Sequence, residues 1–408
     1  MIIDSNKRFS FILAFIFPVI GLFFSIKWRY KPWAKNLFWL FCSFTGLVII
    51  FNYSSAYDIY HYATQLKDFY YADISFNELS NMFFTKEGVD IYQFVMVYFT
   101  SRFTANAHIL FFLYALIYGF FYSRNIWYVY EKKNNENKSY HIGILVLYIA
   151  LIWPFWQIAG ARFGTAFHVF LYGAIPYIFE KDKSKIIFVF LSAFAHFTFI
   201  FPIIVFIFFF LVPLKQNILL VIYTITLFIK EINLSLVNDF LNAHMPSFLH
   251  SRINAYTNEE YMMIRKGMSF GLHVTLTNQI GNVAVQILLF FSYFILKKFL
   301  SNHQKINNLF FFSVLLGSCI NIFSLIPIGD RFLALSQILI LTTFVFIFSE
   351  LKISNPYRKR IVPVILLLFI PIILKIRVGC DYFGFSLFGN LITAFLVEDT
   401  MPFIEFIK

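Results

Sequence analysis

Apolar runs of membrane-spanning length recur from one end of the sequence to the other, and this feature constrains the fold most. Inside lipid every backbone N–H and C=O needs a partner within the protein, so only α-helices and closed β-barrels span a bilayer. Barrel strands alternate polar and apolar residues, which these runs do not. The sequence therefore predicts an all-α fold, a polytopic membrane helical bundle of about 12 transmembrane helices. The predicted spans lie near residues 9–26, 37–51, 106–129, 141–157, 163–179, 186–212, 218–230, 272–296, 307–326, 331–350 and 361–376.

The composition excludes a soluble protein. Apolar residues make up 60% of the chain and charged residues 13%, whereas a soluble domain is roughly half apolar and a quarter charged. The three scattered Cys exclude a disulfide framework and a paired-cysteine metal site. The 33 Lys and Arg exceed the 21 Asp and Glu. In a membrane protein this excess indicates basic cytoplasmic loops, so we expect no nucleic-acid partner.

The distribution of Lys and Arg predicts the orientation of the spans. Short segments between spans hold 4, 4, 3, 3 and 4 of these cations, which places them in the cytoplasm: 27–35, 123–140, 180–185, 297–306 and 351–360. The N-terminus, the segment 52–105, the large loop 231–271 and the tail after residue 376 are then expected on the periplasmic side. Residues 1–408 are predicted to form a single integral membrane domain.

Two segments on opposite sides of the membrane must be joined by an odd number of membrane crossings. We therefore predict that residues 89–103 form a helix in the outer interface and that 106–129 is the true span. Three crossings between Lys185 and Asn233 make 186–212 a hairpin of two short helices, with its apex near Ala195-His196-Phe197.

Two arginines stand where predicted spans begin on the outer side, Arg162 and Arg331. An Arg at this level often serves as an anchor whose long side chain reaches the interface. Outer anchors are more often aromatic, however, and Gly160 and Gly164 leave room for a ligand beside Arg162. Asp330 is available as a partner for Arg331. We favour phosphate binding, because guanidinium forks and helix N-termini both suit that anion.

Acidic and aromatic residues flank the first outer segment. Helical spacing places Asp58, His61 and Tyr62 on one face, which fits an interfacial tyrosine belt as well as it fits a site. Glu87 and Asp90 precede a predicted helix, where acidic residues usually complement the helix dipole.

The predicted hairpin apex and the large outer loop supply further candidates. His196 is isolated among apolar residues, where a structural role and a proton-transfer role are equally expected. Arg252 and Tyr256 are exposed candidates for contacts with sugar or phosphate. The sequence contains no P-loop, His-Glu-x-x-His or Gly-x-Ser-x-Gly motif. We therefore expect no cofactor and no metal, and a reaction driven by an activated substrate.

The order of these residues along the predicted topology resembles the bacterial polysaccharide polymerases of the Wzy type, particularly their EpsG-like branch. The resemblance covers most of the chain. Its motifs are an Asp-x-x-x-Tyr after the second span, an acidic residue heading a helix, an Arg-x-x-x-Ala helix, a helix ending in His, an outer Arg-x-x-x-Tyr and a late Arg that starts a span. In this sequence they are Asp58 and Tyr62, Glu87, Arg162 and Ala166, His196, Arg252 and Tyr256, and Arg331.

This resemblance implies a metal-independent membrane glycosyltransferase in the bacterial inner (cytoplasmic) membrane, with its active site facing the periplasm. It would polymerise undecaprenyl-diphosphate-linked oligosaccharide repeat units into O-antigen or a related surface polysaccharide. Its partners would be the lipid-linked glycan donor and acceptor, membrane lipid and a chain-length regulator protein. The implied substrate- and diphosphate-binding residues are Arg162, Arg331, Arg252, Tyr256 and Tyr62, and the candidate bases are His196, Asp58 and Glu87.

Proteins of other classes share this general architecture. A lipid-linked oligosaccharide flippase or another transporter is one alternative, and the second is an O-antigen ligase or an acyltransferase, both of which also use large outer loops. A transporter predicts cations deep in the bundle and short outer loops. This sequence has few charges at the membrane midplane and long outer loops, which favours the polymerase.

Overall fold

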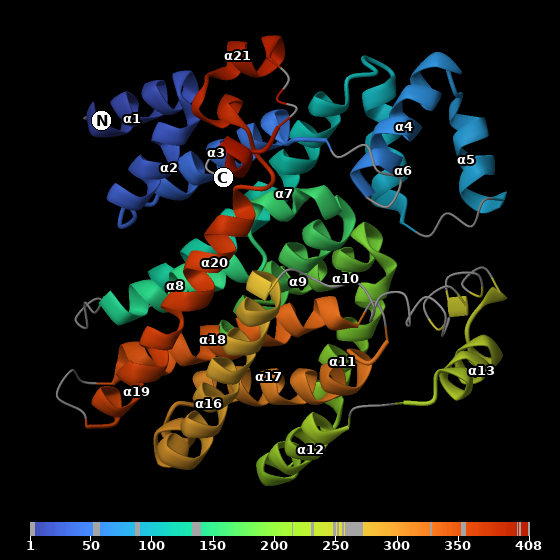
Figure 1. Ribbon diagram of the computed structural model, residues 1–408. Helices are drawn as coiled ribbons and strands as arrows, with labels where there is room; N and C mark the ends of the chain where they lie inside the picture. Colours follow the sequence, from blue (N-terminus) through green and yellow to red (C-terminus); the bar gives the residue numbers. More distant parts are fainter. Residues whose placement is uncertain are drawn as a thin grey trace.

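The computed structural model describes residues 5–51, 58–85, 90–132, 140–213, 215–229, 232–247, 250, 253–254, 257, 272–326, 329–351, 356–397, 399 and 401–406. These residues form helices and connections, with one isolated bridge between Ile49 and Phe383, which confirms the all-α prediction (Figure 1). The first half contains α1 (Ser5–Ile16), α2 (Pro18–Lys27), α3 (Ala34–Val48), α4 (Asp58–Tyr71), α5 (Phe76–Thr85), α6 (Ile91–Ser101), α7 (Ala107–Glu131), α8 (Tyr140–Ile152), η1 (Phe155–Gly160), α9 (Ala161–Glu180) and α10 (Ile186–Ala195). The second contains η3 (Phe197–Phe199), α11 (Ile200–Leu211), α12 (Gln216–Phe228), α13 (Leu234–His244), α16 (Leu272–Asn302), α17 (Gln304–Phe323), α18 (Asp330–Glu350), α19 (Pro356–Leu367), α20 (Phe369–Gly379) and α21 (Leu391–Leu396).

The described chain is a multi-pass membrane protein. Six of its helical stretches are long and apolar enough to cross a bilayer, and four shorter apolar helices accompany them. The six are Ala107–Glu131, Tyr140–Glu180, Asn278–Asn302, Gln304–Phe323, Arg331–Glu350 and Lys359–Gly379. The second of these contains α8, η1 and α9 in succession. The number of about 12 crossings stays a prediction.

The N-terminal segment differs from the prediction of a single span over 9–26. α1 and α2 form a tight helical hairpin, because the rings of Phe9 and Phe24 lie 6.2 Å apart although 15 residues separate them in sequence. Phe17 has an extended backbone between the two helices, and Pro18 begins α2 without an N–H to continue α1. Helices of 12 and 10 residues reach only about 18 and 15 Å, so neither alone crosses the hydrocarbon. The prediction of one span over 9–26 is therefore wrong, while the side on which the N-terminus lies stays a prediction.

The chain turns back at His196, as the sequence predicted. α10 ends at Ala195, the residue His196 has an extended backbone, and the 3₁₀ turn η3 leads into α11. Phe199 packs on Phe163 near the start of α9, and Phe206 packs on Tyr177 near its end. The chain beyond His196 therefore runs back along the length of α9.

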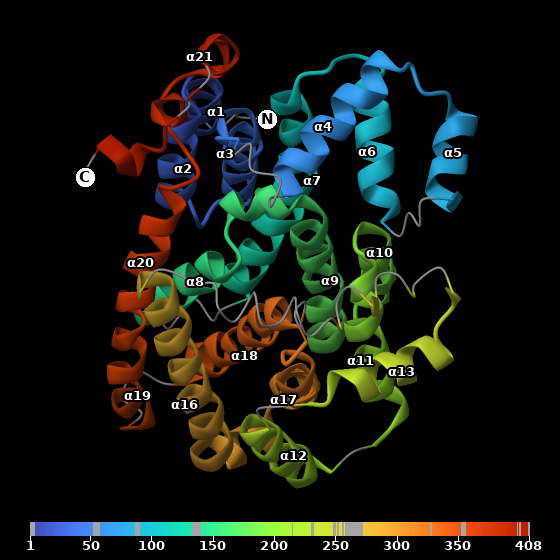
Figure 2. The same cartoon turned by 45° about the vertical axis from the view of Figure 1, so that its right-hand side comes forward.

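The helices α4, α5 and α6 form a group of their own at one corner of the molecule, apart from α16 to α20 (Figures 1 and 2). α6 covers most of the predicted helix 89–103 and packs against α4. It is not among the described helices that are long and apolar enough to span the membrane. This group carries the first residues of the candidate site.

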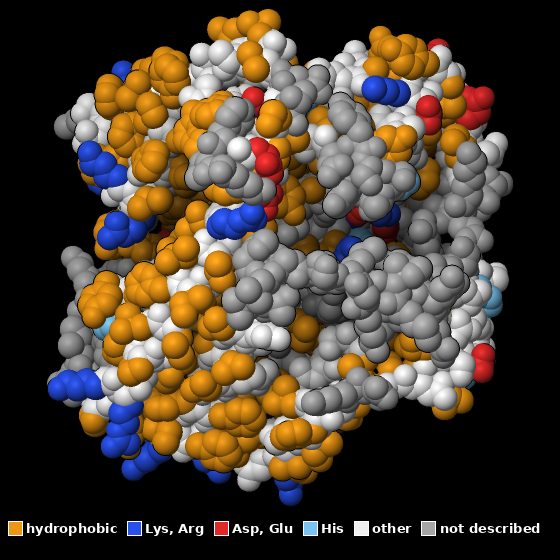
Figure 3. All heavy atoms as spheres, viewed as in Figure 1, with side chains coloured by type: hydrophobic (Ala, Val, Ile, Leu, Met, Phe, Trp, Pro, Cys, Tyr) orange, Lys and Arg blue, Asp and Glu red, His pale blue; other side chains and the backbone are white. Residues whose placement is uncertain are grey.

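The connections rich in Lys and Arg meet at one end of the bundle, here called the basic end. Lys35 pairs with Glu131 at 3.4 Å, and Lys132 pairs with Glu180, so the predicted cytoplasmic segments after α2, α7 and α9 are joined. Lys and Arg side chains also gather at the lower left of Figure 3, where Figure 1 has α19 and the end of α16. The opposite end of the bundle contains the starts of α9 and α18.

Candidate active site

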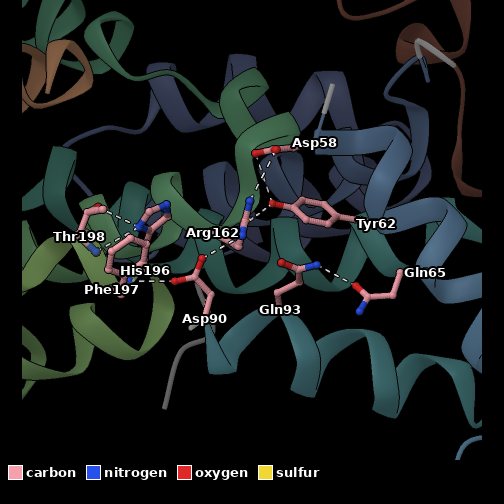
Figure 4. A network of polar contacts seen from close by, with 9 residues as sticks. All are labelled: Asp58, Tyr62, Gln65, Asp90, Gln93, Arg162, His196, Phe197 and Thr198. Carbon is pink, nitrogen blue, oxygen red and sulfur yellow. Dashed lines mark hydrogen bonds and ion pairs between the residues drawn. The ribbon is translucent and has the colours of Figure 1, made fainter. Parts of the chain in front are cut away.

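Arg162 is the centre of a polar cluster at the start of α9 (Figure 4). Its Nε donates to the hydroxyl of Tyr62 at 2.6 Å, and its Nη1 donates to Oδ2 of Asp90 at 2.9 Å. Its Nη2 lies 3.6 Å from Oδ1 of Asp58. The cluster thus joins α4, the residue before α6, and α9, and it holds two carboxylates against one guanidinium.

Asp90 holds two other segments together and is the site residue that the sequence analysis missed. Its side chain is 5% exposed, and its Oδ1 accepts a hydrogen bond from the backbone N–H of Phe197 at 2.9 Å. It makes no side-chain cap to α6, so the predicted helix-dipole role does not account for its contacts. The signal was present in the sequence as an acidic residue beside an apolar helix. Only the approach of Arg162 and Phe197, which are distant in sequence, distinguishes it from an ordinary helix start.

His196 sits at the apex of the α10–α11 hairpin and is buried. Its Nδ1 accepts from the backbone N–H of Thr198 at 3.3 Å and contacts the Thr198 hydroxyl at 2.8 Å. A neutral imidazole that accepts through Nδ1 carries its proton on Nε2. His196 therefore caps the turn η3 and presents a donor on its other nitrogen, which suits hydrogen bonding better than proton abstraction.

Asp58 and Tyr62 form the open side of the cluster. The Asp58 side chain is 40% exposed, compared with 5% for Asp90 and 21% for Arg162. Tyr62 is buried, and its hydroxyl lies 3.4 Å from Oδ2 of Asp58. Burial raises the pKa of the Tyr62 hydroxyl although the Arg162 charge acts against that shift, so Tyr62 stays protonated at neutral pH. Asp58 is thus the carboxylate of this cluster that a ligand reaches most easily.

A pair of amides extends the polar strip along α4 and α6. Nε2 of Gln93 donates to Oε1 of Gln65 at 2.7 Å, and Figure 4 shows both side chains below the Tyr62 ring. Both residues are partly exposed. Amides of this kind offer donors and acceptors to sugar hydroxyls.

Arg331 lies at the same end of the bundle but lines a separate cavity. Its guanidinium carbon is 5.8 Å from the ring centre of Phe163, and the same ring lies 5.6 Å from the His196 ring. Arg162 is not among the residues that line this cavity. The two predicted phosphate-binding arginines are therefore near one another through Phe163, while each has its own polar surroundings.

The remaining predicted residues divide into two groups. Glu87, Arg252 and Tyr256 lie outside the described residues, so their roles stay predictions. Of the two glycines expected to make room for a ligand, Gly160 has open space where a Cβ would stand. At Gly164 that position is 2.8 Å from the ring of Tyr118, so this glycine serves packing.

Within the described parts of the chain, no three His, Cys, Asp or Glu side chains come together as metal ligands. On the face shown in Figure 3, a recess lies below the upper helices, and both basic and acidic side chains are visible inside it. The site itself combines charged groups of both signs at the start of α9.

These features define a class of protein: a multi-pass helical membrane protein with a charged site at one end of its bundle. The family model of the EpsG family matches residues 35–386, which is most of the chain. The chain therefore belongs to the EpsG family, which is linked to exopolysaccharide synthesis. A comparison with curated proteins and one with solved structures both find no match.

Proposed function

We propose that this protein polymerises lipid-linked glycan repeat units at the periplasmic face of a bacterial inner membrane. The observation that supports this proposal most is the cluster in which Arg162 holds the exposed carboxylate of Asp58 beside the hydroxyl of Tyr62. Membership of a family linked to exopolysaccharide synthesis agrees with it. The amides of Gln65 and Gln93 extend the same surface with groups suited to sugar hydroxyls.

In the proposed reaction Asp58 is the general base. Its carboxylate takes the proton of the acceptor sugar hydroxyl, and the oxygen forms a bond to the anomeric carbon of the donor chain. The bond from that carbon to the lipid diphosphate breaks, and the diphosphate leaves with the electron pair. No further reactant is needed, because the donor is already activated.

Arg162 supports this step by positioning. Its guanidinium contacts Tyr62, Asp90 and Asp58 at once, and two carboxylates balance its single charge. We therefore assign it the orientation of Asp58, while the earlier expectation of direct diphosphate binding stays a prediction. Arg331 has no carboxylate partner among the described residues and suits the developing charge on the diphosphate better.

The proposal is tested in a strain that lacks this gene and carries the wild-type chain or a variant. We expect Asp58→Asn to leave a single repeat unit on its acceptor in a glycan ladder gel, because asparagine keeps the shape of the side chain but is no base. Asp68→Asn removes an exposed carboxylate of the same helix and is the matched control, with normal long chains expected. Long chains from Asp58→Asn would overturn the assignment of the base.

The deletion strain itself tests the class of protein. Loss of a polymerase leaves one repeat unit, whereas loss of a ligase leaves the acceptor bare. Loss of a flippase leaves no repeat unit at the surface. Either of the last two patterns would contradict the proposed function.

A further inference from the structure

A cavity of about 320 Å³ lies beside Arg331, where η1 and the ends of α8, α16, α18 and α20 meet. Two cations line it, Arg331 from α18 and Lys375 from α20. Lys375 is half-buried, and its Nζ lies 3.4 Å from the backbone oxygen of Ile152. We call this space the cationic cavity. Lys375 stands inside an apolar run, and the sequence alone gave no reason to select it.

The described residues that line the cationic cavity carry a net positive charge. No Asp or Glu is among its described lining residues, and within the described chain neither Arg331 nor Lys375 pairs with a carboxylate. Its other polar side chains are neutral amides: Gln157, Asn278, Asn282 and Gln337. Arg331 is exposed, whereas Lys375 is half-buried in an apolar helix, where a cation without a counter-charge is costly. A cation in that position beside a second one indicates an anionic ligand. Amide N–H groups and two cations together match the oxygens of a phosphate group.

A second, larger recess of about 690 Å³ adjoins this cavity between α12, α16, α17 and α18. Asn282, Leu333 and Gln337 line both spaces, and the amides of Asn282 and Gln337 are hydrogen-bonded to one another at the junction. We call this second space the apolar recess, because most of its wall is aliphatic and aromatic, including Phe290 and Phe291.

The apolar recess opens toward the lipid-facing side of α16. Among its lining residues, Val283 is 58% exposed and Phe294 is 66% exposed, although both belong to a helix long and apolar enough to span the membrane. A path therefore leads from the lipid-facing surface of α16, through the apolar recess, to the cationic cavity. A ligand that fills both spaces has a long apolar part and an anionic head.

We propose that these two spaces together bind an isoprenoid lipid through its phosphate head, with the phosphate on Arg331 and Lys375 and the start of the tail in the apolar recess. This inference rests on the proposed function and deepens it, since it names Lys375 and the path of the tail. In this arrangement the leaving diphosphate binds in the cationic cavity and not at the Asp58 cluster, where two carboxylates balance the charge of Arg162.

The test uses the purified full-length chain in detergent and measures binding of three probes by titration. They are farnesyl diphosphate, which has head and tail, inorganic diphosphate, which has only the head, and farnesol, which has only the tail. We expect farnesyl diphosphate to bind at least about tenfold more tightly than either of the other two. Equal affinity for inorganic diphosphate would show that the site takes free phosphate and would overturn the lipid assignment.

Variants then test the residues. Lys375→Gln and Arg331→Gln are each expected to weaken farnesyl diphosphate binding by about tenfold or more, since each removes a charged hydrogen bond. Lys375→Arg keeps the charge and should retain most of the affinity, which excludes misfolding as the cause. Arg377→Gln is the matched control, because Arg377 lies on the same helix and pairs with Asp381 at 2.6 Å, and it does not line the cavity. Unchanged binding by Lys375→Gln would refute the inference.

A bulky residue in the apolar recess tests the tail. Val283 lines the recess and is 58% exposed, so a larger side chain fits there without overpacking the core. Val283→Trp is expected to weaken binding of farnesyl diphosphate and to leave that of inorganic diphosphate unchanged, and equal loss of both would overturn the tail path. The two proposals fail separately. If Asp58→Asn loses long chains but Lys375→Gln binds the lipid normally, only the lipid site is refuted. If Lys375→Gln binds the lipid weakly but Asp58→Asn still makes long chains, only the assignment of Asp58 as the base is refuted.

Discussion

The carboxylate of Asp90 lies 2.9 Å from Nη1 of Arg162, although 72 residues separate them in sequence. The other oxygen of Asp90 accepts the backbone N–H of Phe197 at the hairpin apex. This one side chain therefore links the segment before α6, the start of α9 and the turn after α10. Because Asp90 is 5% exposed, the pair is shielded from water and its partners depend strongly on each other.

Replacement of Asp90 by asparagine is expected to destabilise the protein and to abolish polymerisation. Removal of one partner of a buried ion pair typically costs about 3–5 kcal/mol. Asp58 stays near Arg162, but it lies 3.6 Å away and is 40% exposed, so it offsets only part of this loss. The measurement is the thermal unfolding midpoint of the purified chain in detergent, together with the glycan ladder. Asp73→Asn is the control. Asp73 pairs with Arg102 at 2.7 Å but is 92% exposed, so its loss should cost less than about 1 kcal/mol. Equal midpoints for the two variants would contradict a buried role for Asp90.

Lysine cannot replace Arg162, and we expect Arg162→Lys to lose polymerisation as fully as Arg162→Ala. A lysine offers one ammonium on a flexible stem, whereas the guanidinium reaches Tyr62, Asp90 and Asp58 through three different nitrogens. Ladder gels of the two variants, with Arg8→Lys at an exposed position of α1 as a control, check this expectation. Long chains from Arg162→Lys would show that only the positive charge matters there.

The sequence predicted those parts of the fold that depend on local pattern. The hairpin apex near His196 and the helix over 89–103 both followed from the number of crossings that the basic segments allow. The bend between α1 and α2 was missed, because the run through Phe17 and Pro18 is uniformly apolar and suits one long span as well as two short helices. A proline inside an apolar run was the available signal.

The candidate site was predicted in part for a similar reason. Arg162, Asp58 and Tyr62 were recognised as polar residues at the ends of spans, and the structure brings them together. Asp90 was assigned to a helix dipole, since its contact with Arg162 depends on tertiary packing. Lys375 was overlooked because one cation in a long apolar run resembles an anchor. Its companion in the cavity is Arg331, which lies on another helix.

Removal of the Tyr62 hydroxyl is expected to lower polymerisation while the fold remains. Tyr62→Phe leaves Nε of Arg162 without its acceptor, which typically costs about 1–3 kcal/mol for a buried group. Burial raises the pKa of this hydroxyl, so it stays protonated on both sides of neutral pH. The ratio of wild-type to variant activity should therefore stay constant between about pH 6 and pH 9. Tyr60→Phe on the same helix is the control. A ratio that changes with pH in this range would show that Tyr62 titrates and would contradict the assignment.

α3 and α7 pack closely against each other at Gly46, and this contact supports the helices that carry the site. A Cβ at Gly46 would lie 2.3 Å from the backbone oxygen of Phe111 and 2.7 Å from Cβ of Ala115, so the two helices would have to separate. We expect Gly46→Ala to lower stability by about 1–3 kcal/mol, as overpacking commonly does. At Gly143 in α8 no atom lies within 4 Å of the added Cβ, and the residue is exposed. Gly143→Ala should therefore be neutral or slightly stabilising, since alanine favours the helix. Thermal unfolding of both variants in the same detergent provides the comparison. If Gly46→Ala unfolds at the wild-type temperature, α3 and α7 do not pack as closely as the structure has them, and the position of Asp58 relative to Arg162 would lose its support.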